Sequence, residues 1–140
     1  MNIDIVCVGA LRERYWRDAA AEYAKRLSPY CKLSVTEARE AARLPLEHGA
    51  DAYLIALDVR GGKLSSEGLA SKMEALALSG KSRLVFFIGG ADGLSSEVLD
   101  RVDMRLSFSD MTFPHQLMRV ILLEQIYRAF KIQKHEPYHK

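Results

Sequence analysis

Three glycines directly follow the most apolar segment of the chain. Residues 84–88 read Leu-Val-Phe-Phe-Ile, and Gly89, Gly90 and Gly93 come next, ahead of a pair of serines. Glycine lets a backbone approach a ligand with no Cβ in the way, and ligands bind at the carboxyl edge of a parallel sheet. The spacing matches neither a phosphate-binding loop nor the dinucleotide fingerprint. The glycines therefore predict either a ligand-binding edge or a tight turn between a strand and a helix.

The second candidate is the segment that follows the last predicted strand. It reads Phe108-Ser109-Asp110-Met111-Thr112-Phe113-Pro114 and leads into a helix. It mixes apolar and hydroxyl side chains, and its proline is of the kind that opens helices. An ordinary strand-to-helix loop is the alternative interpretation.

The third candidate is the C-terminal tail, which reads His135-Glu136-Pro137-Tyr138-His139-Lys140. Tyrosine and histidine rings stack on bases, and lysine meets phosphate. Terminal residues usually fray and have no function. We take the tail as a candidate for contact with RNA, and we expect that its removal would hardly change the stability of the fold.

Two residues just before the tail have the spacing of an ion pair. Glu124 and Arg128 lie four apart in a predicted helix, in the order that favours pairing. That pair, or a contact at the rim of a dimer interface, is one interpretation. The other is an arginine beside RNA phosphate or the substrate base. His48 and His115 have no partner visible in the sequence, and His115 is placed to cap the start of the helix.

Alternating strands and helices must position these residues. Runs of apolar and β-branched residues predict strands at 3–8, 32–38, 52–57, 84–88 and 105–108, with Gly61-Gly62 as a turn. Apolar spacings of three and four predict helices over 12–27, 66–79, 96–102 and 115–132. Residues 39–51 predict a short helix or loop. The alternation favours a single α/β domain over residues 1–140, with a mostly parallel sheet and helices on both faces.

The last predicted helix is apolar on nearly every side. Such a helix must be covered on every side, and a chain of 140 residues has little material left with which to cover its final helix. We therefore predict a homodimer whose interface includes residues 115–132. Burial of this helix in the core of its own chain is the alternative.

Composition narrows the class of protein. The apolar fraction of 49% and the charged fraction of 27% are ordinary for a globular domain. The net charge of +2 does not by itself indicate a nucleic-acid binder, although the stretch from Pro114 onward is the most basic. Cys7 and Cys31 form neither a disulfide framework nor a metal site. We expect a cytoplasmic protein with reduced thiols, no signal peptide, no membrane span and no metal.

Four motifs, in order, carry a resemblance to a known family. They are Phe87–Ser95, Met111–Arg119, Glu124–Ala129 and Pro137–Lys140, and the opening Ile5–Gly9 also fits. The chain resembles the small SPOUT-class methyltransferases that modify a pseudouridine of large-subunit ribosomal RNA at N3. The resemblance covers nearly the whole chain, but the connection over 39–51 is shorter than is usual in the family. It implies a C-terminal trefoil knot, a homodimer, S-adenosylmethionine as cofactor, and ribosomal RNA, within the ribosome, as partner.

The resemblance also implies site residues. The cofactor site is expected to be lined by Leu57, Gly89, Phe108, Ser109, Asp110, Met111, Thr112 and Phe113. The proton on the acceptor nitrogen must leave, so a base or a cation beside it helps, and the candidates for these catalytic roles are Arg128, Tyr138 and His139. We expect Gly89→Val to block cofactor binding while the protein remains folded.

Two other functions compete with methyl transfer. One is a non-catalytic, ribosome-associated binding protein that keeps the fold. The intact tail and both cofactor motifs argue against it. The other is an enzyme that binds a nucleotide or a flavin in a cleft of the sheet. The missing phosphate-cradling pattern argues against that class.

Overall fold

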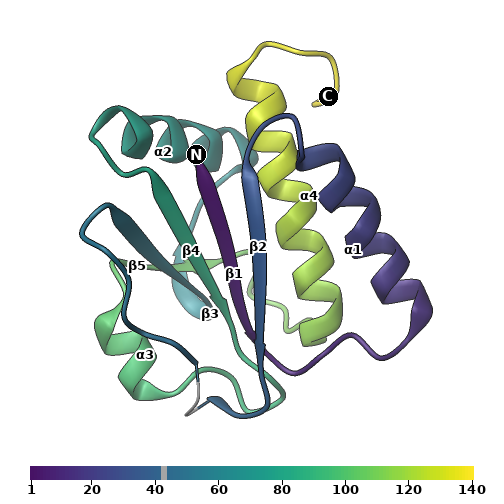
Figure 1. Ribbon diagram of the computed structural model, residues 1–140, viewed down its shortest axis with the longest axis vertical. Coiled ribbons are helices and arrows are strands. Elements are labelled where there is room, and N and C mark those ends of the chain that lie inside the picture. Colours follow the sequence, from purple (N-terminus) through teal and green to yellow (C-terminus); the bar gives the residue numbers. More distant parts are fainter. Residues whose placement is uncertain (42–43) are drawn as a thin grey trace.

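The computed structural model describes residues 1–41 and 44–140, and in this part of the chain one five-stranded sheet forms the centre (Figure 1). The strands are β1 (Asn2–Val8), β2 (Lys32–Ala38), β3 (Ala52–Lys63), β4 (Arg83–Ile88) and β5 (Met104–Ser107). The helices are α1 (Arg14–Leu27), α2 (Ser66–Leu78), α3 (Ser96–Arg101) and α4 (His115–Gln133). The strand order is β2-β1-β4-β3-β5, and every neighbouring pair is parallel. The predicted parallel α/β architecture is confirmed.

The alternation of side chains along each strand divides the core between the two faces of the sheet. On one face, Ile5 and Phe86 belong to a large core that includes residues of α2, α4 and the end of α1. On the other face, Val6 and Phe87 belong to a smaller core with Val98 of α3. Helices therefore cover both faces, as predicted, with α1, α2 and α4 on one side and the short α3 on the other (Figure 1).

Helix α4 packs between α1 and α2 against the sheet (Figure 1). Seven of its residues are buried, including Leu122, Ile126 and Phe130, and the others are half-buried. The core of its own chain thus covers much of this helix, which is the alternative that the sequence left open. One stripe stays only half-buried, and it consists of Leu117, Val120, Ile121, Glu124 and Arg128.

Some sequence-based expectations about local structure are wrong. Gly61 and Gly62 do not form a turn, because β3 continues to Lys63 with a shift of register against β5. A Cβ on Gly61 would lie 2.6 Å from the backbone of Arg105, so this glycine permits close approach of two strands. His115 does not cap α4: Pro114 occupies the N-cap position, with no side-chain hydrogen bond.

Two helices begin at serine caps. Ser65 caps α2 and Ser95 caps α3, each accepting a hydrogen bond from a backbone N–H three residues later. The expected short helix or loop at 39–51 includes residues 42–43, which lie outside the described residues. In the parts of the chain that the structure describes, no helix is long and apolar enough to span a membrane. The trefoil knot implied by the family resemblance remains a prediction.

Candidate active site

The residues expected to line the cofactor site meet at the carboxyl edge of the sheet. Leu57 pairs with Leu106 of β5, and Ala56 beside it pairs with Phe87 of β4. Gly89 directly follows β4, and Phe108 directly follows β5. Three neighbouring strands therefore deliver the predicted residues to one place, as expected for a parallel sheet.

Hydrogen bonds within the loop and an ion pair to β3 hold the segment 108–113 at this edge. The Ser107 hydroxyl donates to the carbonyl of Ser109 at 2.9 Å, and the Met111 N–H donates to the Ser109 hydroxyl at 3.0 Å. Asp110 forms an exposed ion pair with Lys63 at the end of β3. Met111 is 72% exposed. The loop thus offers apolar surface that its own chain does not cover.

Gly89 is required for a tight turn, which is one of the two interpretations that the sequence left open. A Cβ on Gly89 would lie 2.3 Å from the carbonyl carbon of Gly93. Gly93 closes a turn by donating its N–H to the carbonyl of Gly90 at 3.0 Å, and its φ of +76° favours glycine. The expectation that Gly89→Val leaves the fold intact is therefore wrong, because added bulk meets the protein's own backbone.

A buried arginine ties the start of α4 to the same edge. The guanidinium of Arg119 donates to the carboxylate of Glu37 at 2.6 Å and to the carbonyl of Gly9 at 3.0 Å. Only 5% of Arg119 is exposed. Since Gly9 follows β1 and Glu37 belongs to β2, the arginine joins two strand ends to the helix that follows the loop 108–113. Arg119 therefore fixes the position of the first turns of α4, into which the loop 108–113 leads.

The expected catalytic residues gather around Glu124 on α4. The Tyr138 hydroxyl donates to a Glu124 oxygen at 2.7 Å, and Arg128 donates to Glu124 through Nη2 at 2.8 Å. The Arg128 guanidinium lies over the Tyr138 ring, 4.8 Å from its centroid. Arg128 Nη1 lies 2.9 Å from His139 Nδ1. The structure thus brings Arg128, Tyr138 and His139 into one cluster.

The cluster decides which of these residues can exchange a proton. Burial, and then the hydrogen bond to Glu124, raise the pKa of Tyr138 to about 12. The phenol therefore keeps its proton near neutral pH and cannot serve as a base. The hydrogen bond to Glu124 raises the pKa of Arg128, so this side chain stays a cation.

The tail is not a frayed end. The Tyr138 ring meets Tyr127 edge-on at 4.8 Å and packs against the large core. Glu136 accepts hydrogen bonds from the Tyr30 hydroxyl at 2.9 Å and from Lys131 at 3.1 Å. The expectation that the tail adds almost nothing to stability is therefore wrong, because these contacts fold it back onto α4 and the turn before β2.

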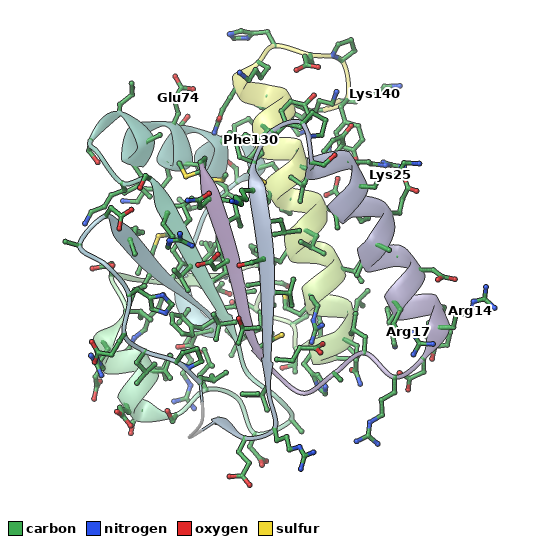
Figure 2. All side chains as sticks on the ribbon, viewed as in Figure 1. Arg14, Arg17, Lys25, Glu74, Phe130 and Lys140 are labelled. Atoms are coloured by element: carbon green, nitrogen blue, oxygen red, sulfur yellow. The ribbon has the colours of Figure 1, made fainter. Side chains whose placement is uncertain are left out.

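Within one chain, the loop 108–113 leads into the first turn of α4, whereas the tail cluster lies along the second half of this helix. His115 begins the helix beside Gly9, at the carboxyl edge. Phe130 near its other end stacks on Tyr30, just before β2 begins. Figure 2 shows Lys140 and Phe130 at the upper end of the molecule, away from Arg14 and Arg17 at the lower end of α1. His115 and Arg128 are separated by about 20 Å along the helix at 1.5 Å per residue.

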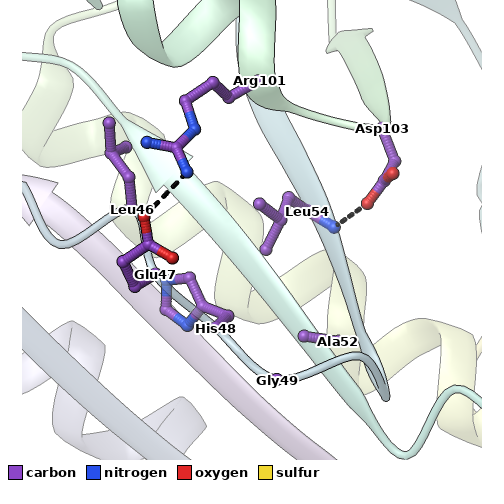
Figure 3. A pocket seen from close by; sticks show the side chains of 8 residues that line it. All are labelled: Leu46, Glu47, His48, Gly49, Ala52, Leu54, Arg101 and Asp103. Carbon is purple, nitrogen blue, oxygen red and sulfur yellow. Dashed lines mark hydrogen bonds and ion pairs between the residues drawn. The ribbon is translucent and has the colours of Figure 1, made fainter.

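Two cavities lie elsewhere. One, of about 190 Å³, is drawn in Figure 3 and is lined by Leu46, Glu47, His48, Gly49, Ala52, Leu54, Arg101 and Asp103. Its polar groups bond to each other or to backbone: Arg101 donates to Glu47 at 2.9 Å, and Asp103 accepts from the N–H of Leu54 at 2.8 Å. The other, of about 360 Å³, lies between α1, β2 and α4, with Arg119 and Glu37 in its wall. Neither is lined by a residue predicted for the site.

Some residues of these clusters were not predicted. Glu67 of α2 lies 2.5 Å from His139 Nε2, and Glu37 pairs with Arg119 across the fold. Both partners are far apart in sequence, so neither periodicity nor spacing indicates them. The pairing of Glu124 with Arg128, one of the interpretations that the sequence left open, is confirmed. Among the described residues, no three His, Cys, Asp or Glu side chains are grouped so that they could hold a metal ion.

Comparison with known proteins identifies the family. A model of the family described as "Predicted SPOUT methyltransferase" matches residues 1–139. The chain belongs to the SPOUT methyltransferase family. This methyltransferase is 52% identical to the Ribosomal RNA large subunit methyltransferase H of Bifidobacterium animalis subsp. lactis (strain AD011), over the whole of both chains. It is 50% identical to the protein of the same name from Clostridium novyi (strain NT), again over the whole of both chains.

A solved structure supports the fold of this SPOUT methyltransferase. A probable methylase family protein from Haemophilus influenzae Rd KW20 aligns with 99% of this chain and 70% of its own, with a TM-score of 0.62 and 14% identity. The alignment with the Bifidobacterium relative spans 160 positions, against the 140 residues of this chain. The shortened connection over residues 39–51 stays a prediction.

Proposed function

We propose that this methyltransferase transfers a methyl group from S-adenosylmethionine to N3 of a pseudouridine in large-subunit ribosomal RNA. The observation that carries the proposal is identity of about half over the full length of relatives named Ribosomal RNA large subunit methyltransferase H. The whole of residues 1–140 acts as one domain. Its place is the cytoplasm, where the ribosome is, and it needs neither metal nor membrane.

The residues at the carboxyl edge fit an adenosine-containing cofactor. Phe108 and Leu57 offer half-buried apolar surface, and Met111 offers exposed apolar surface. The short loop presents backbone N–H and carbonyl groups beside them, and such a combination of apolar walls and a few polar groups is typical of cofactor sites. Ser109, Asp110, Thr112 and Phe113 complete the proposed lining, with Gly89 holding the turn beneath it. When bound there, the cofactor supplies a methyl group carried on a sulfonium.

The tail cluster fits the acceptor side of the reaction. The acceptor nitrogen must lose its proton, and a fixed cation nearby favours the anion that results. Arg128 is such a cation, held by Glu124 and by the ring of Tyr138. His139 is the group of the cluster that can take up a proton, once Arg128 releases its Nδ1. Tyr138 acts through stacking and by orienting Glu124, because its high pKa excludes it as a base.

A homodimer joins the two halves of the site. The half-buried stripe on α4 is apolar near the cofactor edge, at Leu117, Val120 and Ile121, and charged near the tail, at Glu124 and Arg128. If two such helices pack in opposite directions, the tail cluster of one chain lies beside the cofactor edge of the other. The separation of about 20 Å within one chain then no longer prevents the two clusters from acting on one base. Buried apolar surface is also what a permanent interface requires.

The test is methyl transfer to ribosomes that lack the modification. Purified ribosomes are incubated with the enzyme and labelled S-adenosylmethionine, and the ribosomal RNA is then analysed base by base by mass spectrometry. We expect one methyl group, on N3 of one pseudouridine. Binding of S-adenosylmethionine in calorimetry, without binding of nucleoside triphosphates or flavin, is the accompanying result. Ribosome binding without methyl transfer would instead identify a non-catalytic protein and contradict the proposal.

A further inference from the structure

His139 is held between two side chains from two different helices. Its Nδ1 lies 2.9 Å from Nη1 of Arg128 on α4. Its Nε2 lies 2.5 Å from Oε1 of Glu67 on α2. Glu67 lies in the first turn of α2, two residues after the capping Ser65. The position of this carboxylate is therefore set by α2 and not by the tail.

The hydrogen-bonding capacity of the neighbours fixes the state of the imidazole. A guanidinium has five N–H donors and no acceptor, so Nδ1 must present its lone pair to Arg128. The proton of the neutral ring is then on Nε2, which donates it to the Glu67 carboxylate. In neutral histidine one ring nitrogen donates and the other accepts. Here Arg128 and Glu67 determine that Nδ1 accepts and Nε2 donates.

The other hydrogen bonds of Arg128 exclude the arrangement in which Nδ1 of His139 carries the proton. Its Nε and Nη2 both donate to Glu124, at 3.1 and 2.8 Å. Glu124 is also occupied by the hydroxyl of Tyr138. Nη1 is the group left to face His139, and it can only donate. The hydrogen bond to His139 is also the main cause that lowers the pKa of Glu67, which keeps that side chain a carboxylate.

We propose that Glu67 is a positioning residue for methyl transfer: it fixes the tautomer and the orientation of His139 and anchors the tail to α2. This inference rests on the proposed role of His139 beside the acceptor nitrogen. The side chain of Glu67 bonds to His139 and not to the residues proposed to line the cofactor site. Its loss should therefore reduce turnover and leave the affinity for S-adenosylmethionine unchanged.

Glu67→Ala removes the acceptor, and Glu67→Gln keeps an oxygen that can accept from Nε2–H. We expect Glu67→Ala to lower the rate of methyl transfer at saturating ribosomes by about tenfold, a fraction of what acid–base groups contribute. Glu67→Gln should restore most of the rate. Glu74→Ala is the matched control: Glu74 is an exposed glutamate on the same helix and projects into solvent (Figure 2), and its replacement should change neither rate nor affinity.

The state of the ring is read directly by ¹⁵N NMR of the imidazole nitrogens, with His139→Gln used to assign the signals. In the unaltered protein, His139 should show a protonated Nε2 and an unprotonated Nδ1. Glu67→Ala should lose that preference, and Glu67→Gln and Glu74→Ala should keep it. An unchanged spectrum or an unchanged rate in Glu67→Ala would overturn the inference. Failure of the unaltered protein to methylate ribosomes would contradict the proposed function instead, while the spectra would still judge the positioning of His139.

Discussion

Gly89 has the sequence pattern of a ligand site, and in the structure it allows close packing of the chain's own backbone. Its place after the most apolar strand indicated either a backbone that approaches a ligand or a tight turn. The structure shows that the nearest atoms to an added Cβ belong to Gly93 and Leu94 of the same chain. The sequence pattern cannot distinguish these two reasons for a glycine, because both require the absence of a Cβ.

Replacing Gly89 should therefore destabilise the protein. We expect Gly89→Ala to lower the free energy of unfolding by about 1–3 kcal/mol, the usual range for overpacking, as measured by urea denaturation. Gly62→Ala is the control, since a Cβ at Gly62 meets nothing within 4 Å. A Gly89→Ala variant as stable as the unaltered protein would contradict this prediction and show that the turn at Gly93 shifts at little energetic cost.

The two thiols make the stability of the fold depend on pH in the alkaline range. Burial raises the pKa of Cys7 and of Cys31 to about 11, from an ordinary value of 9.0. The folded protein thus holds these protons more tightly than the unfolded chain does. Their contribution is complete below about pH 9 and is lost as the pH rises through about 11. Urea denaturation across this range should show falling stability, with a shallower fall in a Cys7→Ala/Cys31→Ala variant. Equal slopes in both proteins would refute this assignment.

At the scale of elements, the strands and most helices could be predicted from apolar periodicity. A helix or strand that buries one face must repeat apolar residues with its own structural period. The length of β3 could not, since Gly61-Gly62 reads as a turn until the partner strand β5 is known. The clustering of 108–113 with Leu57 and Gly89 followed from a parallel sheet. The contacts of Glu67 and Glu37 did not, because they depend on how distant helices and strands pack.

The tail is the element whose behaviour was most misjudged from sequence. Deleting Pro137–Lys140 removes the ring of Tyr138 from Tyr127 and its hydroxyl from Glu124. We expect the free energy of unfolding to fall by about 2–4.5 kcal/mol, the sum expected from an aromatic pair and a hydrogen bond to a charged group. Methyl transfer should be lost, and calorimetric affinity for S-adenosylmethionine should stay the same. Deleting Lys140 alone, as a control, should leave stability intact. Weakened cofactor binding in the longer deletion would place the tail in the cofactor site.

At the scale of the whole molecule, α4 separates the two halves of the proposed site. The helix runs from the carboxyl edge to the opposite end of the sheet over 19 residues, about 28 Å at the usual rise. Its half-buried stripe changes from apolar to charged along that length. In the proposed homodimer, two chains that pack in opposite directions would bring the acceptor cluster of each chain to the cofactor edge of the other and so form two complete sites.

Mixing two inactive variants tests this account most directly. One variant lacks Pro137–Lys140, and the other carries Thr112→Trp, which places bulk on the exposed loop of the cofactor edge. Each alone should fail to methylate ribosomes. After the chains are mixed and allowed to exchange, about half of the dimers are mixed and have one working site of two, so about a quarter of the unaltered rate should return. A mixture that stays inactive, although mass analysis shows mixed dimers, would contradict a site shared between two chains.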